Sequence, residues 1–279
     1  PRIVNCTNGE LWLELDGSVK FKSHNPDSRL TSQVACEFDP KATCPSWDAM
    51  CDKVFQACDS PAEMIRHFHE LFGYILQPDR HHAMSILLKG PGGNGKSTLA
   101  DIVRCVMGRD AVLSTSIAEL SKGANAHFTD SCQGKLMLLD DDFKKDALLP
   151  DDWIKKFSEA KSLSANPKFG RPYEFMARCT PVILTNFWPP TADLSEGILR
   201  RMMILETTHV LSVAEKDPMH VLQVKRHELP GVLNRLLQGL VRVLKRGQRF
   251  DVPAEAEESK RRWFKSSNAT VRFVSEVAD

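Results

Sequence analysis

Five short apolar runs recur in the middle of the chain, between residues 83 and 206, with polar or helix-like stretches between them. Continuous apolar runs of this length are typical of strands whose two faces are both covered by helices. The pattern therefore predicts an α/β fold with a mainly parallel five-stranded sheet in a three-layered core. The runs are 84–88, 111–113, 136–139, 181–184 and 202–205.

Two of the stretches between these runs have clear helix signals. One helix is expected over 97–107, because the apolar pattern stops at Gly108. A second is expected over 151–160, because Pro150 is followed by two acidic residues, which stabilise the amino end of a helix.

The regions on both sides of the core are expected to be mostly helical. Apolar residues recur at helical spacing over 47–76 and 231–245, and a short helix is predicted over 270–277. Residues 1–40 have the pattern of irregular chain with short hairpins. The predicted domains are an N-terminal irregular and helical domain at 1–78, an α/β core at 79–209 and a C-terminal helical region at 210–279.

Charge and composition limit which ligands and which cellular setting this chain is expected to have. Lys and Arg number 37 against 36 Asp and Glu, so any nucleic-acid binding must be local. No apolar run approaches the roughly 20 residues of a membrane span, and no membrane association is expected. The eight cysteines include no CxxC pair, which favours reduced, mostly buried thiols and no metal beyond one carried by a nucleotide. The chain starts at Pro1 without a signal peptide, so we expect an upstream domain in the same polypeptide.

The segment GPGGNGKST follows one of the apolar runs and opens a predicted helix. It fits the phosphate-loop pattern of Gly, four residues, then Gly-Lys-Ser or Thr. In that context backbone amides and the helix amino end can surround phosphates, the lysine can reach the outer phosphates, and the serine can bind Mg²⁺. We therefore expect ATP and Mg²⁺ as ligands. The predicted nucleotide-binding residues are Gly90, Pro91, Gly92, Gly93, Asn94, Gly95, Lys96, Ser97 and Thr98.

Three aspartates follow the next buried run, in KLMLLDDD. Carboxylates at the end of such a strand are typical of a magnesium and water site, so Asp140 is expected to hold Mg²⁺ and Asp141 to polarise the attacking water. Asp142 could share the second role, and a solvated acidic turn is the alternative. The chain lacks the Asn-Lys-x-Asp of guanine-specific GTPases.

Two further candidates follow in the chain. Asn186 ends the run PVILTN and could orient the water or sense the γ-phosphate, although Asn is also a common turn residue. Arg200 and Arg201 precede the last run, where an arginine could reach the nucleotide of a neighbouring subunit. A surface arginine pair is the alternative.

A basic turn lies between the aspartates and Asn186, in the sequence PKFGRPY. Lys168 and Arg171 flank Phe169, which predicts the tip of a hairpin. Two cations with an aromatic ring can contact phosphates and stack on bases of a single strand. An ordinary exposed hairpin is the alternative, but a ring of copies would concentrate positive charge in a central channel.

In the order of these motifs the chain resembles the superfamily 3 helicases, a branch of the AAA+ ATPases, and especially the phage and plasmid primase-helicases related to the poxvirus primase-helicase. The resemblance extends to both flanks. The segments that carry it are GPGGNGKST, KLMLLDDD, the basic hairpin, PVILTN and ILRRMMIL, with NGELWLELDG, FDPKATCPSWDAMCDKVF and FGYILQPDR before them and ELPGVLNRLLQGL and FDVPAEAE after them.

This resemblance implies an AAA+ phosphate-loop core that hydrolyses ATP in a homo-oligomer, a hexamer, while moving along single-stranded DNA at a replication fork. The DNA-contacting hairpin would carry Lys168 and Arg171, and Arg201 matches the arginine finger better than Arg200. It further implies an upstream primase domain, and action in the cytoplasm of a phage- or plasmid-carrying bacterium or in a viral replication compartment. Many relatives have Glu where this chain has three Asp.

Two other functions fit the same motifs. One is an AAA+ ATPase that remodels or loads protein partners, and the other is an ATP-gated DNA-binding assembly module. Stimulation of ATP turnover by single-stranded DNA distinguishes the helicase from both.

Overall fold

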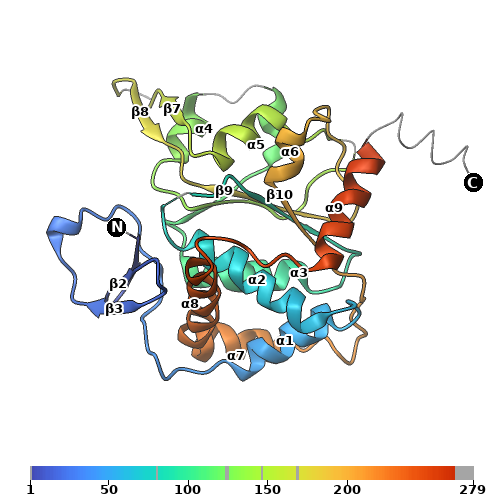
Figure 1. The fold of residues 1–279 in the computed structure, drawn as a ribbon, viewed down its shortest axis with the longest axis horizontal. Helices are drawn as coiled ribbons and strands as arrows, with labels where there is room; N and C mark the ends of the chain where they lie inside the picture. Colours follow the sequence, from blue (N-terminus) through green and yellow to red (C-terminus); the bar gives the residue numbers. More distant parts are fainter. Residues whose placement is uncertain (1, 80, 123–125, 146, 168–169, 268–279) are drawn as a thin grey trace, which may run out of the picture.

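The computed structural model describes residues 2–79, 81–122, 126–145, 147–167 and 170–267 (Figure 1). A five-stranded sheet lies at its centre, and every pair of neighbouring strands in it is parallel. The strand order is β10, β4, β9, β6, β5. The five predicted strands are therefore confirmed. They are β4 Ser85–Lys89, β5 Val112–Ser114, β6 Met137–Asp140, β9 Thr180–Thr185 and β10 Met202–Glu206.

Helices cover both faces of this sheet and give the three predicted layers (Figure 1). Side chains of β4 alternate between two hydrophobic cores, since Ile86 and Leu88 lie in one and Leu87 lies in the other. The helices of the first core are α1 Pro45–Phe55, α2 Pro61–Ile75, α3 Lys96–Met107 and α8 Leu229–Lys245. The second face carries α4 Ala126–Ser131, α5 Asp151–Ser158 and α6 Glu196–Arg201.

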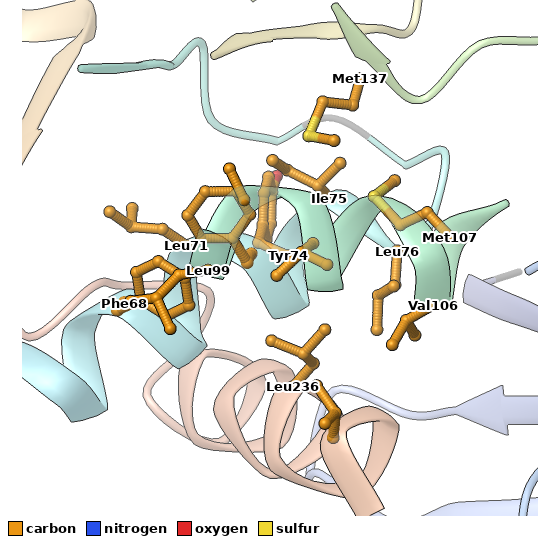
Figure 2. Close-up of a cluster of buried hydrophobic side chains, with 14 of the residues drawn as sticks. Phe68, Leu71, Tyr74, Ile75, Leu76, Leu99, Val106, Met107, Met137 and Leu236 are labelled. Carbon is orange, nitrogen blue, oxygen red and sulfur yellow. The ribbon is translucent and has the colours of Figure 1, made fainter. Parts of the chain in front are cut away.

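The first core joins helices that are far apart in the sequence. Figure 2 shows buried side chains of α2, α3 and α8 that point toward one another beneath Met137 of β6. Helices α2 and α8 approach so closely at Gly73 and Gly239 that a Cβ on either would lie about 2 Å from a backbone oxygen of the other helix. The two predicted helical flanks and the sheet therefore share one core.

Smaller elements lie at the edges of this core. The first residues form an antiparallel sheet of three strands, in agreement with the predicted short hairpins. The predicted basic hairpin is also present as a two-stranded antiparallel ribbon. The elements are β1 Arg2–Cys6, β2 Gly9–Leu13, β3 Val19–Lys22, β7 Ser162–Ala165 and β8 Tyr173–Met176, with 3₁₀ turns at Pro26–Ser28 and Ile117–Lys122.

The C-terminal part contains a helix that the sequence analysis did not predict. After α7 Pro218–Gln223, a π-helical turn Val224–Glu228 and α8, the chain forms α9 Ala254–Ser267. Pro253 and the acidic first turn are helix-start signals in the sequence of α9. However, most of its residues are charged or polar, so few apolar positions indicate which face of the helix is buried. The predicted helix over 270–277 lies outside the described residues.

Two expectations from composition concern the cysteines and the membrane. All eight cysteines are free thiols, and seven of them are buried, as expected. Among the described helices, none has the length and hydropathy needed to cross a bilayer.

We predict that Gly239→Ala destabilises the fold, because the new methyl group would lie 2.1 Å from the His69 carbonyl oxygen and would push α8 away from α2. The expected loss in the free energy of unfolding is roughly 1–3 kcal/mol or more. Urea titration followed by circular dichroism measures it. The exposed neighbour Gln238→Ala is the control and should change stability by about 0.5 kcal/mol or less. Equal stability of the two variants would contradict the close approach.

Candidate functional site

The parallel sheet brings three loops to one edge. Strand β9 lies between β4 and β6, with Lys89 opposite Thr185 and Asp140 opposite Ile183. Because parallel strands end at the same edge, the loops that follow β4, β9 and β6 are neighbours. The predicted phosphate loop, Asn186 and the aspartates lie in these three loops.

A hydrogen bond joins the phosphate loop to Thr207, the residue that follows β10. Asn94 is buried, and its Nδ2 donates to the Thr207 hydroxyl at 2.6 Å while its Oδ1 accepts the Lys96 amide at 3.2 Å. Gly95 has a φ of +88°, a left-handed conformation that favours glycine, and α3 begins at the next residue. The turn and the helix amino end that the motif requires are therefore both present.

Lys96 joins the phosphate loop to the loop after β9. Its Nζ donates to Asn186 Oδ1 at 2.6 Å and to the Gly90 and Pro91 carbonyl oxygens at 3.1 and 3.2 Å. Burial lowers the pKa of Lys96. The side chain is only 6% exposed, so its ammonium group is held at the edge of the sheet by these acceptors.

A cleft of about 280 Å³ opens beside this lysine. Residues from all three loops line this cleft. Their side chains carry hydroxyl and carboxylate oxygens, which are the ligands that Mg²⁺ prefers. The cleft is lined by Gly92, Gly93, Lys96, Ser97, Asp141, Asp142, Phe143, Leu184, Thr185, Asn186 and Phe187. Six of the predicted nucleotide and catalytic residues thus lie in one cleft, and their donor set fits ATP with Mg²⁺. They are Gly92, Gly93, Lys96, Ser97, Asp141 and Asn186.

Asp140 lies apart from this cleft. Its side chain is only 4% exposed, and its Oδ2 accepts the Ile117 amide at 2.6 Å. Burial raises the pKa of Asp140, and the hydrogen bonds from backbone amides oppose that shift. Asp141 and Asp142 are exposed and line the cleft. That Asp140 holds Mg²⁺ stays a prediction: its Oδ2 binds the loop after β5, and its Oδ1 accepts from the Asp142 amide at 3.4 Å.

The two candidate arginines differ in exposure. Arg201 is 5% exposed, and its guanidinium pairs with Glu159 and donates to the Gly197 carbonyl oxygen. Burial lowers the pKa of Arg201. Arg200 is exposed at the end of the same short helix, α6. The geometry thus favours Arg200 over Arg201 as the arginine that can reach another molecule.

The basic hairpin projects from the edge of the molecule, at the upper left of Figure 1. Arg171 is exposed in the turn between β7 and β8. Lys168 and Phe169 lie outside the described residues. The hairpin is therefore present where the motif predicted it, and its role in DNA binding stays a prediction.

A second cavity, of about 350 Å³, lies on the other side of the phosphate loop. Gly95 and Thr98 border it, and the remaining walls come from α1 and from the segment after β10. In this segment the Leu211 amide donates to the Gly93 carbonyl oxygen at 3.2 Å. Lys216 Nζ lies 3.2 Å from the position that a Cβ on Gly93 would occupy. Sequence reasoning missed both residues, because no local motif marks them.

Helix α9 is attached to the same edge of the sheet. Glu206, at the end of β10, accepts from Lys89 and Arg262 at 2.6 Å each, and from the Ser259 hydroxyl at 3.0 Å. The buried Trp263 indole donates to the Pro189 carbonyl oxygen at 2.8 Å, three residues after Asn186. The C-terminal helix therefore contacts β10, whose Glu206 also binds Lys89 at the end of β4, and the loop that carries Asn186.

Comparisons with known families match two separate parts of the chain. Residues 88–201 match a family of unknown function (DUF5906), and residues 1–56 match the family described as D5 N terminal like. No curated protein matches the chain.

Solved structures share its fold at low identity. The apo C-terminal region of NrS-1, in its A form, is 17% identical with a TM-score of 0.54, over 93% of this chain and 59% of that one. A 305–718 form of that region is 12% identical with a TM-score of 0.55, over 96% and 74%. This chain thus spans about three fifths of the first structure. A JCV helicase structure has a TM-score of 0.44, too low to support an argument.

We predict that Arg201→Ala destabilises the protein by roughly 1–3 kcal/mol, because it removes a buried guanidinium that pairs with Glu159 and opens a space beneath α6, while Lys161 still pairs with the other Glu159 carboxylate oxygen. Thermal and urea unfolding measure the loss. Arg200→Ala is the matched control on the exposed side of α6, with an expected change of about 0.5 kcal/mol or less. An unchanged midpoint for Arg201→Ala would show that its guanidinium is not a structural partner of Glu159.

Proposed function

We propose that this chain is the ATP-hydrolysing motor of a DNA helicase of superfamily 3, of the phage and plasmid primase-helicase type. The observation that carries the proposal is the meeting of Lys96, Asn186 and two exposed aspartates in one cleft beside a phosphate loop. The match of residues 1–56 to the D5 N terminal like family supports it. The order of the motifs along the chain supports it as well.

In this proposal the cleft holds the outer phosphates and Mg²⁺. Amides of the phosphate loop and the Lys96 ammonium would bind phosphate oxygens, and the Ser97 hydroxyl with Asp141 would hold the metal. Bound Mg²⁺ would supply positive charge that stabilises the transferring phosphoryl group. Asp142 would polarise the attacking water, and Asn186 would orient it. Asp140 would act indirectly, by fixing the loop after β6 through Ile117.

The apolar cavity beside Gly95 and Thr98 would hold the base. Its walls are mostly apolar, and it lies at the end of the phosphate loop opposite the aspartates. An ATP molecule bound across the amino end of α3 would reach both spaces. Lys216 would then add a second positive charge near the phosphates.

The remaining parts of the proposal concern assembly. We assign the arginine finger to the exposed Arg200, which would reach the nucleotide of the next subunit in a hexameric ring, while Arg201 holds α6 in place. Lys168, Phe169 and Arg171 of the hairpin would contact single-stranded DNA in the channel. The ring would then act at a replication fork, with a primase domain upstream in the same polypeptide.

The aspartates provide the sharpest test of the site. We expect Asp141→Asn to raise the Mg²⁺ concentration needed for half-maximal ATP turnover, because it removes a metal ligand. Asp142→Asn should lower the maximal rate about 100-fold with that concentration unchanged. Asp140→Asn is the matched control and should have the smallest effect on turnover. A larger effect from Asp140→Asn than from both neighbours would overturn this assignment.

ATP turnover with and without oligothymidine tests the helicase itself. We expect the single strand to stimulate wild-type turnover, and wild-type protein to unwind a tailed duplex. Lys168→Ala with Arg171→Ala should abolish stimulation, because the hairpin can no longer contact phosphates. Lys41→Ala with Lys265→Ala removes the same charge from exposed positions elsewhere and should leave stimulation intact. Turnover that ignores single-stranded DNA would favour a protein-remodelling ATPase.

A further inference from the structure

A groove of about 460 Å³ lies at the opposite edge of the central sheet from the phosphate loop. Residues just before β6 and β9 line it, and these are the amino ends of the strands whose carboxyl ends carry the aspartates and Asn186. Its other walls come from β1, the segment 28–34 and strand β8 of the basic hairpin. In Figure 1 the N-terminal sheet and the hairpin stand on the same side of the molecule. We call this hollow the N-terminal groove.

Positive charge is concentrated in the N-terminal groove. Arg29, Lys135 and Arg178 line it, and none of its described lining residues is acidic. The whole chain has a formal net charge of only +1, so three cations around one groove form a local concentration of positive charge. The groove is therefore suited to an anionic ligand.

Two of these cations, Lys135 and Arg29, differ in their surroundings. Lys135 Nζ donates to the carbonyl oxygens of Arg109 and Asp110 at 3.3 and 3.0 Å. Arg29 is exposed and follows the 3₁₀ turn with a φ of +48°, and within the described part of the chain no ion pair involves it. Among the described residues no carboxylate pairs with either side chain, although the Lys135 ammonium group is held by backbone oxygens outside the groove lining.

The other walls suit a nucleotide rather than a bare anion. Asn5 donates through Nδ2 to the Ser32 carbonyl oxygen at 3.1 Å, while its buried Oδ1 has no hydrogen-bond partner and can accept from a base. Phe175 is half-buried on β8 and adds an aromatic side chain. Cations for phosphates, an aromatic ring and an amide for base edges are the features of single-strand binding sites. The volume is within the roughly 300–1,000 Å³ range of ligand sites.

Strand β8 also connects the groove to the hairpin. It runs from the basic turn, where Arg171 is exposed, to Phe175 and Met176 in the groove wall. A strand of nucleic acid that contacts the hairpin would reach the groove along β8 without crossing the nucleotide site. Strand β8 therefore links the two regions, although it also carries the exposed Glu174.

We propose that the N-terminal groove binds single-stranded nucleic acid next to the hairpin, with Arg29, Lys135 and Arg178 on its phosphates. The nature of this ligand rests on the proposed helicase function. The groove is separate from the nucleotide cleft of the proposed function, because its walls come from the N-terminal sheet and from the residues that precede β6 and β9.

Fluorescence anisotropy with labelled oligothymidine, without ATP and at several salt concentrations, tests this site. The triple variant Arg29→Ala, Lys135→Ala, Arg178→Ala should bind at least about tenfold more weakly than wild type, and the slope of log affinity against log salt should fall by about 2. The control triple variant is Lys41→Ala, Arg261→Ala, Lys265→Ala, which removes three exposed cations outside the groove. Equal weakening in both, or wild-type binding by the groove variant, would overturn the proposal.

Photo-cross-linking covers the case in which the triple variant does not fold. Benzoylphenylalanine in place of Thr31, in the groove wall, should cross-link to the labelled oligothymidine, whereas in place of the exposed Val213 it should not. Free thymidine monophosphate at the same nucleotide concentration should compete weakly. Strong competition would indicate a mononucleotide site instead and would also overturn the proposal.

The outcomes separate this inference from the proposed function. A wild-type protein that binds the oligonucleotide through the groove but does not hydrolyse ATP would overturn only the helicase motor. A protein with DNA-stimulated ATP turnover whose groove variant keeps full affinity and the full salt slope would overturn only the groove.

Discussion

The insertion of β9 between β4 and β6, parallel to both, determines where every other functional part of this molecule can lie. It places Lys96, Asn186 and the aspartates on one edge of the sheet, although they come from distant parts of the sequence. The same pairing gathers the amino ends of β6 and β9 at the opposite edge, where the N-terminal groove opens. The two proposed ligand sites therefore lie at opposite edges of one sheet.

Most of the fold and the outline of the site could be predicted from the sequence, because their signals are local. Buried parallel strands are continuous apolar runs, and a phosphate loop needs its glycines, lysine and serine in one short segment. The direction of a side chain depends instead on distant partners. Nothing near Asp140 indicates that Ile117 will bind its carboxylate, and nothing near Arg201 indicates that Glu159 will pair with it.

The parts that were missed share a physical reason. Helix α9 is highly charged, and its attachment depends on a few long-range contacts, such as that of Trp263 with Pro189, rather than on an apolar stripe. Lys216 is placed beside Gly93 by the packing of an irregular segment, for which no periodic pattern exists. Such contacts become visible only when the tertiary structure is known.

The attachment of α9 has a mechanical consequence. Through Glu206 and Trp263, one helix contacts both β10, whose Glu206 also binds Lys89 at the end of β4, and the loop that carries Asn186. Tension on the polypeptide beyond residue 267 would therefore be transmitted to both walls of the cleft at once. A load applied at that end of the chain would therefore change the spacing between Lys96 and Asn186 without any direct contact with the cleft.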